Sequence, residues 1–431
     1  MIIYMISLFI FLCNVINSFK INFIINISSS ICILIIFFIL IYKSFKLKNW
    51  NLFIIFGILG FFIYSILLYY YLSNMNIEFY SSLKKDNSMS IGLNILLLFV
   101  CVFYYFIKKI IKNNKELKNE ILLQKKYKSI IIFFIIVILL LYIWNIGYIS
   151  PMLGEERGII KPIYEYSIIL FILLSFYSGG NKKLIHIVNF LFLIYIIKDL
   201  KYGGRIASIQ LIICYFLIFL SWKIEIKKII PYLFLIFFLF SFVGIFRGNK
   251  EWTIDMMCKI FLSKIKTGFV LDTSISAYFT SLTFIKIKDL FSFSDRMIHL
   301  KNFLYSCIVG GGKINNSELP LISYKHIAHS FGGIYPFYFY YYFSWTGVLI
   351  SGYVLYFYLK YIFKQNKNNF LKCISIYWIS TIFRWFLYTP LTLIRGTLIF
   401  SIFYFLFLTL FHSISTIEKC NINIKRISFF K

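Results

Sequence analysis

Histidines and a carboxylate that could exchange protons lie in one long polar stretch of the chain. His326 and His329 are three residues apart, and Asp295 precedes them in the same stretch. Residues three apart share one face of a helix, and a histidine can accept or donate a proton near neutral pH. The pattern predicts an acid–base site with His329 as the first candidate base, followed by His326 and Asp295. Metal binding and a solvated loop with incidental histidines are the alternatives.

Arginines at helix ends could bind an anion. Arg205 follows a glycine pair in Lys201-Tyr-Gly-Gly-Arg, and Arg247-Gly248 repeats the pattern more weakly. Glycines allow close backbone approach, and a guanidinium at a helix N-terminus suits a phosphate. The alternative is an ordinary turn between a loop and a helix. The predicted anion-binding residues are Arg205, Arg247 and Arg296, with Arg384 and Arg395 in reserve. Arg384 lies within an apolar run, so it needs a partner, a water-filled cavity or a path to the interface.

The elements that must position these residues are membrane helices. The chain has 431 residues, of which 60% are hydrophobic and only 14% charged. A water-soluble protein of this size could not bury that much apolar surface, which indicates a polytopic all-α membrane protein. About twelve spans are predicted. They cover approximately 2–18, 21–42, 51–72, 90–107, 129–148, 162–178, 184–199, 206–222, 229–246, 334–359, 369–388 and 394–414.

The chain therefore divides into spans one to nine (1–246), a large loop (247–333), spans ten to twelve (334–414) and a tail (415–431). Within the loop, residues 252–267 have apolar positions near helical spacing with lysines opposite, which predicts an interfacial amphipathic helix. Cys258 and Cys307 both lie in the loop and could form a disulfide in an oxidising compartment.

Positive charge is distributed unequally over the connections. Twenty-four Lys and Arg residues lie on one side of the predicted spans, and the short connections on the other side hold nine. The positive-inside rule then places both termini in the cytoplasm and the loop outside. Lysines at span ends can contact membrane lipid, so the net charge of +29 does not indicate nucleic-acid binding. We expect no carboxylate in the middle of a span, which disfavours an ion-coupled transporter.

Three segments resemble parts of a known family. They are Gly-Gly-Arg205 at a span entry, His329-Ser-Phe-Gly-Gly333, and the aromatic span that continues to Trp345-Thr-Gly347 and Gly352. Together with the twelve-span layout, they are similar to bacterial O-antigen and capsule repeat-unit polymerases of the Wzy type. The distance from His329 to Gly347 is longer than in the related O-antigen ligases, which favours a polymerase.

The resemblance implies a glycosyltransferase in the bacterial cytoplasmic (inner) membrane. Such an enzyme joins repeat units carried on undecaprenyl pyrophosphate into O-antigen or capsule at the outer face. External arginines would bind the pyrophosphate, and an external His or carboxylate would take the proton of the attacking hydroxyl. No metal or cofactor is expected, whereas a chain-length regulator and a flippase are expected partners. The alternatives are a lipid-linked oligosaccharide flippase or other polysaccharide transporter, and a ligase-like glycosyltransferase.

Overall fold

The computed structural model describes most of the chain as helices. The described residues are 2–16, 23–72, 87–113, 127–149, 159–201, 205–221, 224–225, 262, 271–310, 314–327, 332–363 and 368–429. The all-helical prediction is confirmed for these residues, apart from two strands of two residues each. The predicted span 229–246 and the predicted amphipathic helix lie outside the described residues, except for Leu262. The chain forms two compact units, which are described separately.

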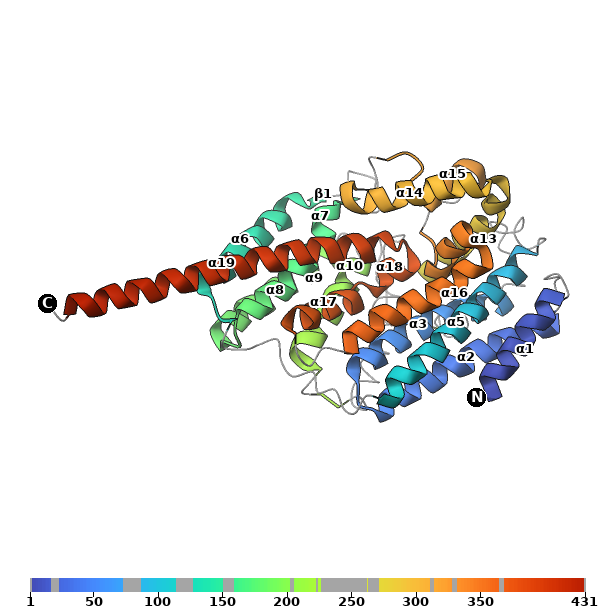
Figure 1. Ribbon diagram of the computed structural model, residues 1–431, viewed down its shortest axis with the longest axis horizontal. Coiled ribbons are helices and arrows are strands. Elements are labelled where there is room, and N and C mark those ends of the chain that lie inside the picture. Colours follow the sequence, from blue (N-terminus) through green and yellow to red (C-terminus); the bar gives the residue numbers. More distant parts are fainter. Residues whose placement is uncertain are drawn as a thin grey trace. The chain divides into compact units, whose positions relative to one another are not determined.

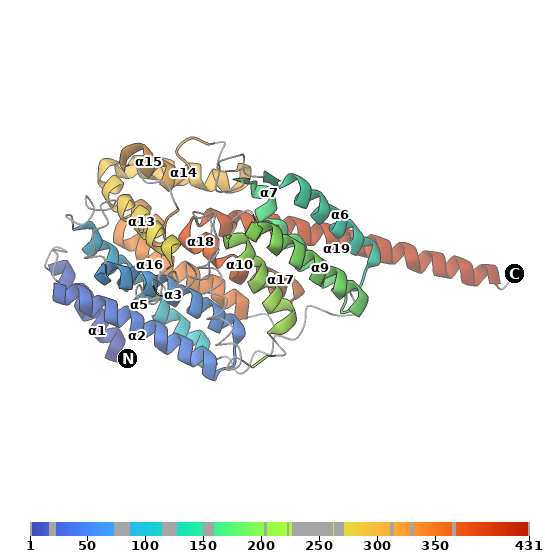
Figure 2. The ribbon, with the colours of Figure 1, turned by 180° about the vertical axis from the view of Figure 1, so that it is seen from behind.

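Unit 1 comprises residues 1–118, 222–367 and 381–394. Its elements are α1 (Ile2–Ile16), α2 (Phe23–Lys46), α3 (Trp50–Leu72), α5 (Ser88–Asn113), α13 (Asp272–Leu290), α14 (Phe293–Val309), α15 (Leu319–Ile327), α16 (Tyr335–Phe363), α18 (Ile382–Leu387) and the start of α19 (Leu391–Phe429). Helices α1, α2, α3 and α5 lie side by side (Figures 1 and 2). Apolar runs become helices here because a helix satisfies its own backbone hydrogen bonds where water is absent.

Polar side chains link three helices of unit 1. The Asn14 amide of α1 donates to the side-chain oxygen of Asn94 in α5 at 2.7 Å. The Ser90 hydroxyl of α5 donates to the side-chain oxygen of Asn26 in α2 at 3.3 Å. Hydrogen bonds between membrane helices contribute about 0.6–2 kcal/mol each. These contacts therefore fix the relative register of α1, α2 and α5 within an otherwise apolar interface.

The segment predicted as a polar loop contributes a buried helix to unit 1. Helix α13 contacts α3, α5, α15 and α16. Its residues Ser274, Ile275 and 277–285 are all buried. Its hydroxyl side chains pair locally, as where Ser281 donates to the carbonyl of Ala277 at 2.7 Å. The yellow helices α13, α14 and α15 lie together in both views (Figures 1 and 2). A stretch that is polar by composition thus packs as core, because Thr280, Ser281 and Thr283 each donate to a carbonyl of their own helix.

Helix α16 differs from the single span predicted over 334–359. Its backbone is non-helical at Ser344, where φ is 56° and ψ is −141°. The Tyr335 hydroxyl donates to the Ser351 carbonyl at 3.4 Å, whereas sixteen residues of straight helix would separate these positions by about 24 Å. We call the segments before and after Ser344 the first arm (335–343) and the second arm (345–363) of α16. Both arms contact the same part of α5, since Tyr335 lies against Phe99 and Gly352 against Val102. The chain therefore reverses direction at Ser344.

Unit 2 comprises residues 119–221, 368–380 and 395–431. Its elements are α6 (Ile130–Ile146), β1 (Tyr148–Ile149), β2 (Ile159–Ile160), α7 (Pro162–Glu165), α8 (Ser167–Tyr177), α9 (Lys182–Lys201), α10 (Arg205–Tyr215), the π-helix η3 (Phe216–Leu220), α17 (Asn369–Ser380) and most of α19. Strands β1 and β2 are antiparallel, with Tyr148 opposite Ile160. Ser129 caps α6 by accepting from the Ile132 N–H at 3.4 Å. Stacked Tyr164 and Tyr195 lie at the centre of the unit, and both are buried.

Long apolar helices make the chain compatible with a membrane-embedded protein. Among the described residues, four helices are long and apolar enough to cross a bilayer: Asn26–Lys46, Trp50–Leu68, Ser88–Ile111 and Leu391–Thr416. Several helices also expose large apolar side chains, including Phe38 at 71% and Ile138 at 65%. Such faces are unfavourable in water and favourable against lipid. Most of the other predicted spans contain helix at their described positions, but 334–359 reverses at Ser344 and 369–388 is divided between α17 and α18. The number of spans stays a prediction.

Candidate functional site

The start of α14 is fixed by a reciprocal cap. The Ser292 side chain accepts from the Asp295 N–H at 3.2 Å, and the Asp295 carboxylate accepts from the Ser292 N–H at 3.1 Å. The same carboxylate accepts from the Ser292 hydroxyl at 2.6 Å. A serine followed three residues later by an acidic residue is a typical helix start, and the pair satisfies backbone N–H groups that the first turn leaves free. This cap fixes the residue at which α14 begins.

Asp295 is better suited to capping than to accepting a proton. Its hydrogen bonds from the Ser292 side chain and backbone lower the pKa of the carboxyl, and the nearby His299 lowers it further. A carboxylate with a lowered pKa is a weak base at neutral pH. Asp295, one of the three predicted bases, therefore supplies a fixed negative charge one turn before His299.

His299 is the buried histidine of this helix, and we did not rank it as a site residue from the sequence. It is 6% exposed, and its Nδ1 lies 2.7 Å from the Tyr341 hydroxyl of α16. Burial lowers the pKa of His299, the Asp295 charge opposes that effect, and His326 reinforces it. The imidazole is accordingly neutral at pH 7, which is the form that can accept a proton. Its position four residues after Asp295 is the sequence signal that could have identified it.

Phe291 separates His299 from His326. The ring of Phe291 lies edge-on to His299 at 5.0 Å and edge-on to His326 at 5.4 Å, measured between centroids. His326 of α15 is exposed, so the two histidines differ in access to solvent. We call Phe291, Asp295, His299, His326 and Tyr341 the histidine cluster. The structure thus brings together two of the three predicted bases and adds a third titratable group between them.

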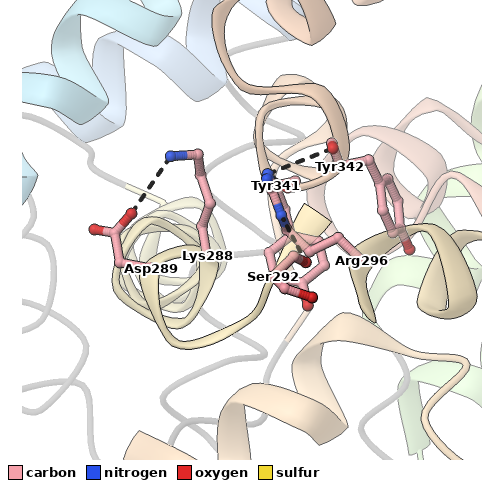
Figure 3. A network of polar contacts seen from close by, with 6 residues as sticks. All are labelled: Lys288, Asp289, Ser292, Arg296, Tyr341 and Tyr342. Atoms are coloured by element: carbon pink, nitrogen blue, oxygen red, sulfur yellow. Dashed lines mark hydrogen bonds and ion pairs between the residues drawn. The ribbon is translucent and has the colours of Figure 1, made fainter. Parts of the chain in front are cut away.

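Arg296 extends from α14 to the backbone of α16 (Figure 3). Its Nη1 donates to the Tyr341 carbonyl at 2.9 Å and lies 3.5 Å from the Tyr342 carbonyl. Its Nε donates to the Ser292 carbonyl at 3.4 Å. Nearby on α13, the half-buried Lys288 and the exposed Asp289 form an ion pair at 3.4 Å. Arg296 therefore has defined protein partners, in addition to its predicted role in binding an anion.

The glycine pair Gly332–Gly333, from the segment that resembles repeat-unit polymerases, is closely surrounded by other parts of unit 1. Gly332 has φ +67°, and the Gly333 N–H donates to the Leu387 carbonyl at 3.0 Å. A side chain at Gly333 would begin 2.4 Å from the Phe284 ring. Both glycines are therefore required for the close approach of this segment to α13 and α18.

Arg384 of α18 lies next to that glycine pair. Its guanidinium carbon is 5.3 Å from the centre of the Tyr388 ring, and the Tyr338 hydroxyl donates to the Tyr388 carbonyl at 2.5 Å. Glu318, within electrostatic range of Tyr338, is half-buried, and burial raises the pKa of its carboxyl. Arg384 is half-buried against an aromatic ring, which is compatible with the predicted reserve role in anion binding. Glu318 is a second titratable group that sequence reasoning did not select.

The remaining predicted residues lie apart from the histidine cluster or outside the described residues. Arg205 begins α10, but its side chain is outside the described part, as are Arg247 and His329. Arg395 belongs to unit 2, where its guanidinium carbon is 5.9 Å from the Tyr166 ring. In α14, the buried Cys307 thiol donates to the Phe303 carbonyl at 3.4 Å, and its predicted disulfide partner Cys258 is not among the described residues.

Unit 2 contains a buried carboxylate near the end of a predicted span. Asp199, the last residue of the predicted span 184–199, is 0% exposed in the last turn of α9. Tyr195, one turn before it, is also buried and donates its hydroxyl to the Leu140 carbonyl at 2.5 Å. Hydropathy alone placed Asp199 at the span end, and the packing of its neighbours buries it there.

No group of three or more His, Cys, Asp or Glu side chains that could hold a metal ion occurs among the residues that the structure describes. Comparison of the chain with family models, with curated proteins and with solved structures gives no match. The chemistry of the site therefore has to be argued from the residues themselves.

Proposed function

We propose that this chain is a membrane glycosyltransferase that polymerises oligosaccharide repeat units carried on undecaprenyl pyrophosphate. The reaction takes place at the outer face of the bacterial cytoplasmic membrane and yields a surface polysaccharide, either O-antigen or capsule. The proposal combines the charge asymmetry of the connections, the resemblance of three segments to repeat-unit polymerases, and the composition of the histidine cluster.

The observation that carries the proposal is a neutral imidazole beside a fixed negative charge in the segment predicted to lie outside. His299 has a pKa lowered by burial, with Asp295 one turn away and His326 across Phe291. This combination supplies a proton acceptor that is unprotonated at the pH of the reaction. A transporter needs no such group, whereas transfer to a sugar hydroxyl does.

The proposed glycosyl transfer is a nucleophilic substitution at the anomeric carbon of the donor sugar. The acceptor hydroxyl oxygen attacks the anomeric carbon of the donor sugar, and the bond from that carbon to the pyrophosphate oxygen breaks. The electron pair of that bond leaves with the polyprenyl pyrophosphate, and the hydroxyl proton passes to the histidine. General base catalysis of this kind typically contributes about 10²–10⁴-fold in rate.

The leaving group requires cations rather than a sugar-nucleotide pocket. A pyrophosphate gains negative charge as the glycosidic bond breaks, and guanidinium groups stabilise it through paired hydrogen bonds. Arg384, half-buried beside the glycine pair, is the described candidate for this role. Arg205 and Arg247 remain predicted candidates on sequence grounds.

Deletion of the gene in its host tests the proposal. We expect lipid-linked single repeat units to persist while long polysaccharide chains disappear from the gel. Complementation with the Arg205→Ala or His299→Gln variant should give full-level, correctly inserted protein without polymer. An unchanged chain-length ladder in the deletion strain would reject the polymerase.

A polysaccharide transporter is the second candidate, and buried Asp199 is the observation that favours it. A carboxylate that is 0% exposed in a predicted membrane helix is typical of ion-coupled transport. Under that function, the deletion strain would accumulate repeat units on the cytoplasmic side of the membrane. The Asp199→Asn variant would then stop their export, whereas under the polymerase proposal export continues.

A further inference from the structure

The reversal of α16 leaves backbone groups that need partners. Ser344, with φ 56° and ψ −141°, cannot continue the helical pattern in which each carbonyl accepts from the N–H four residues later. The last carbonyls of the arm 335–343 are therefore in the position of a helix end, where partners must come from elsewhere. A buried carbonyl without a partner is unfavourable by about 1–3 kcal/mol.

Two residues on one face of α14 hold this arm at the same place. Arg296 donates to the carbonyls of Tyr341 and Tyr342, and His299 bonds the hydroxyl of Tyr341. Arg296 and His299 are three residues apart, so they lie next to each other on the helix surface. Tyr341 is thus held by its backbone and by its side chain at once, and it is itself fully buried.

The second arm closes against the first without space for a side chain. A β-carbon at Gly347 would lie 1.9 Å from the Phe339 carbonyl oxygen. Tyr340 and Trp345, on either side of the reversal, pack edge-on at 5.1 Å between ring centroids. The reversal is therefore a fixed turn, and the guanidinium of Arg296 donates to the carbonyls at the end of its first arm.

We propose that Arg296 is a positioning residue, which fixes Tyr341 at the α16 reversal so that the Tyr341 hydroxyl orients His299 for proton transfer. This inference rests on the proposed function and assigns Arg296 a role different from the anion binding predicted from the sequence. In the required tautomer, His299 Nδ1–H donates to the Tyr341 oxygen and Nε2 accepts the substrate proton. Among the described residues, the charged and titratable groups that act on His299 are Asp295, His326 and Tyr341, while Arg296 reaches it through Tyr341.

The two roles of Arg296 differ in kinetics. Loss of an anion-binding arginine raises KM for the lipid-linked donor, whereas loss of a positioning residue lowers kcat. Misplacement of a catalytic group by about 1 Å costs about 100-fold in rate. We therefore expect Arg296→Gln to lower kcat about 100-fold with little change in KM.

Tyr341→Phe is the variant least prone to misfold, because it removes only a hydroxyl. We expect it to lower kcat as Arg296→Gln does, and the double variant to be no slower than either single variant, since both act through His299. Tyr305→Phe makes the same substitution on the exposed face of α14, where the side chain is 58% exposed, and should match the wild type.

Purified wild type and variants in vesicles, with a lipid-linked repeat unit as substrate, provide the kinetic test. The proposal is overturned if Tyr341→Phe retains wild-type kcat, or if Arg296→Gln changes only KM. Wild type that elongates no repeat unit would instead reject the proposed function.

An NMR pH titration of His299 tests the inference even if the wild type elongates no repeat unit. The chain has five histidines, so the His299 ring signal in an NMR pH titration can be assigned by its loss in His299→Gln. Arg296→Gln and Tyr341→Phe should both move the His299 midpoint, while Tyr305→Phe leaves it unchanged. A midpoint that neither substitution moves would exclude the connection from Arg296 through Tyr341 to His299.

Discussion

His299 derives its chemical character from burial and from two neighbouring groups, Asp295 and His326. Burial between α14 and α16 disfavours the charged imidazolium, and His326 adds to that effect, while Asp295 opposes it. Because the folded-state pKa lies below the ordinary value, folding disfavours protonation of His299. The folded protein therefore loses stability as the pH falls below about 6.5. Activity that depends on neutral His299 should likewise fall as the pH drops below about 6.5.

The neighbouring charges predict opposite shifts of the acidic limb of the pH–activity profile. Asp295→Asn removes the charge that raises the pKa of His299, so the limb should move to lower pH. His326→Gln removes the charge that lowers that pKa, so the limb should move to higher pH. Initial rates of polymer formation between about pH 5 and 8 measure both shifts. Limbs that move in the same direction, or not at all, would show that His299 is not the titrating base.

Sequence reasoning selected the stretch of chain that forms the histidine cluster but not the residue at its centre. It selected Asp295, Arg296 and His326 from residue type and spacing, and these lie around one cluster in the structure. It left His299 unranked because burial against Phe291 and contact with Tyr341 depend on the packing of α14 against α16. Glu318 was missed for the same reason, since its half-buried position arises only when α15 packs in place.

At the scale of elements, the glycines of the aromatic segment acquire physical roles. Gly347 allows the second arm of α16 to approach the Phe339 carbonyl, and Gly333 allows the preceding segment to approach Phe284. The reversal itself was not predictable, because 337–343 is an uninterrupted aromatic run and Ser344 carries no strong turn signal. The hydropathy pattern therefore predicted a single span over 334–359, where the chain in fact changes direction.

Gly347→Ala should destabilise unit 1 strongly. The added β-carbon would lie 1.9 Å from a backbone oxygen that cannot move without opening the reversal. We expect a loss of about 1–3 kcal/mol or more in the free energy of unfolding, measured by thermal or urea unfolding in detergent. Gly57→Ala in α3 is the matched control, because nothing lies within 4 Å of its added β-carbon. That control should be neutral or stabilising by up to about 1 kcal/mol. Equal stability of the two variants would contradict the tight turn.

At the scale of the whole molecule, the side of the membrane on which the histidine cluster lies decides whether it can meet the proposed lipid-linked substrate. Apolar composition predicted the helical membrane class because length and hydropathy are local properties that survive folding. The burial of α13 was not predictable from those properties, since its hydroxyl-rich sequence resembles a solvated loop until the hydroxyls pair within the helix. Charge asymmetry remains the basis for placing α14 and α15 outside.

Labelling of introduced cysteines in intact cells tests that placement. Lys301→Cys lies on the exposed face of α14, and a thiol reagent that cannot cross the membrane should label it from outside. Lys183→Cys, exposed at the start of α9 and predicted to be cytoplasmic, should react only after the membrane is permeabilised. Signals above the wild-type background are compared, because the chain has eight native cysteines. The reverse labelling pattern would place the histidine cluster in the cytoplasm.

The most direct measurement is elongation by the purified protein in vesicles that contain a synthetic polyprenyl-pyrophosphate-linked repeat unit as the sole substrate. The account predicts a ladder of longer glycans with the wild type, the same ladder with Tyr305→Phe, and a loss of about 100-fold or more in rate with His299→Gln. It is contradicted if the wild type leaves only single repeat units, or if His299→Gln builds the ladder at the wild-type rate.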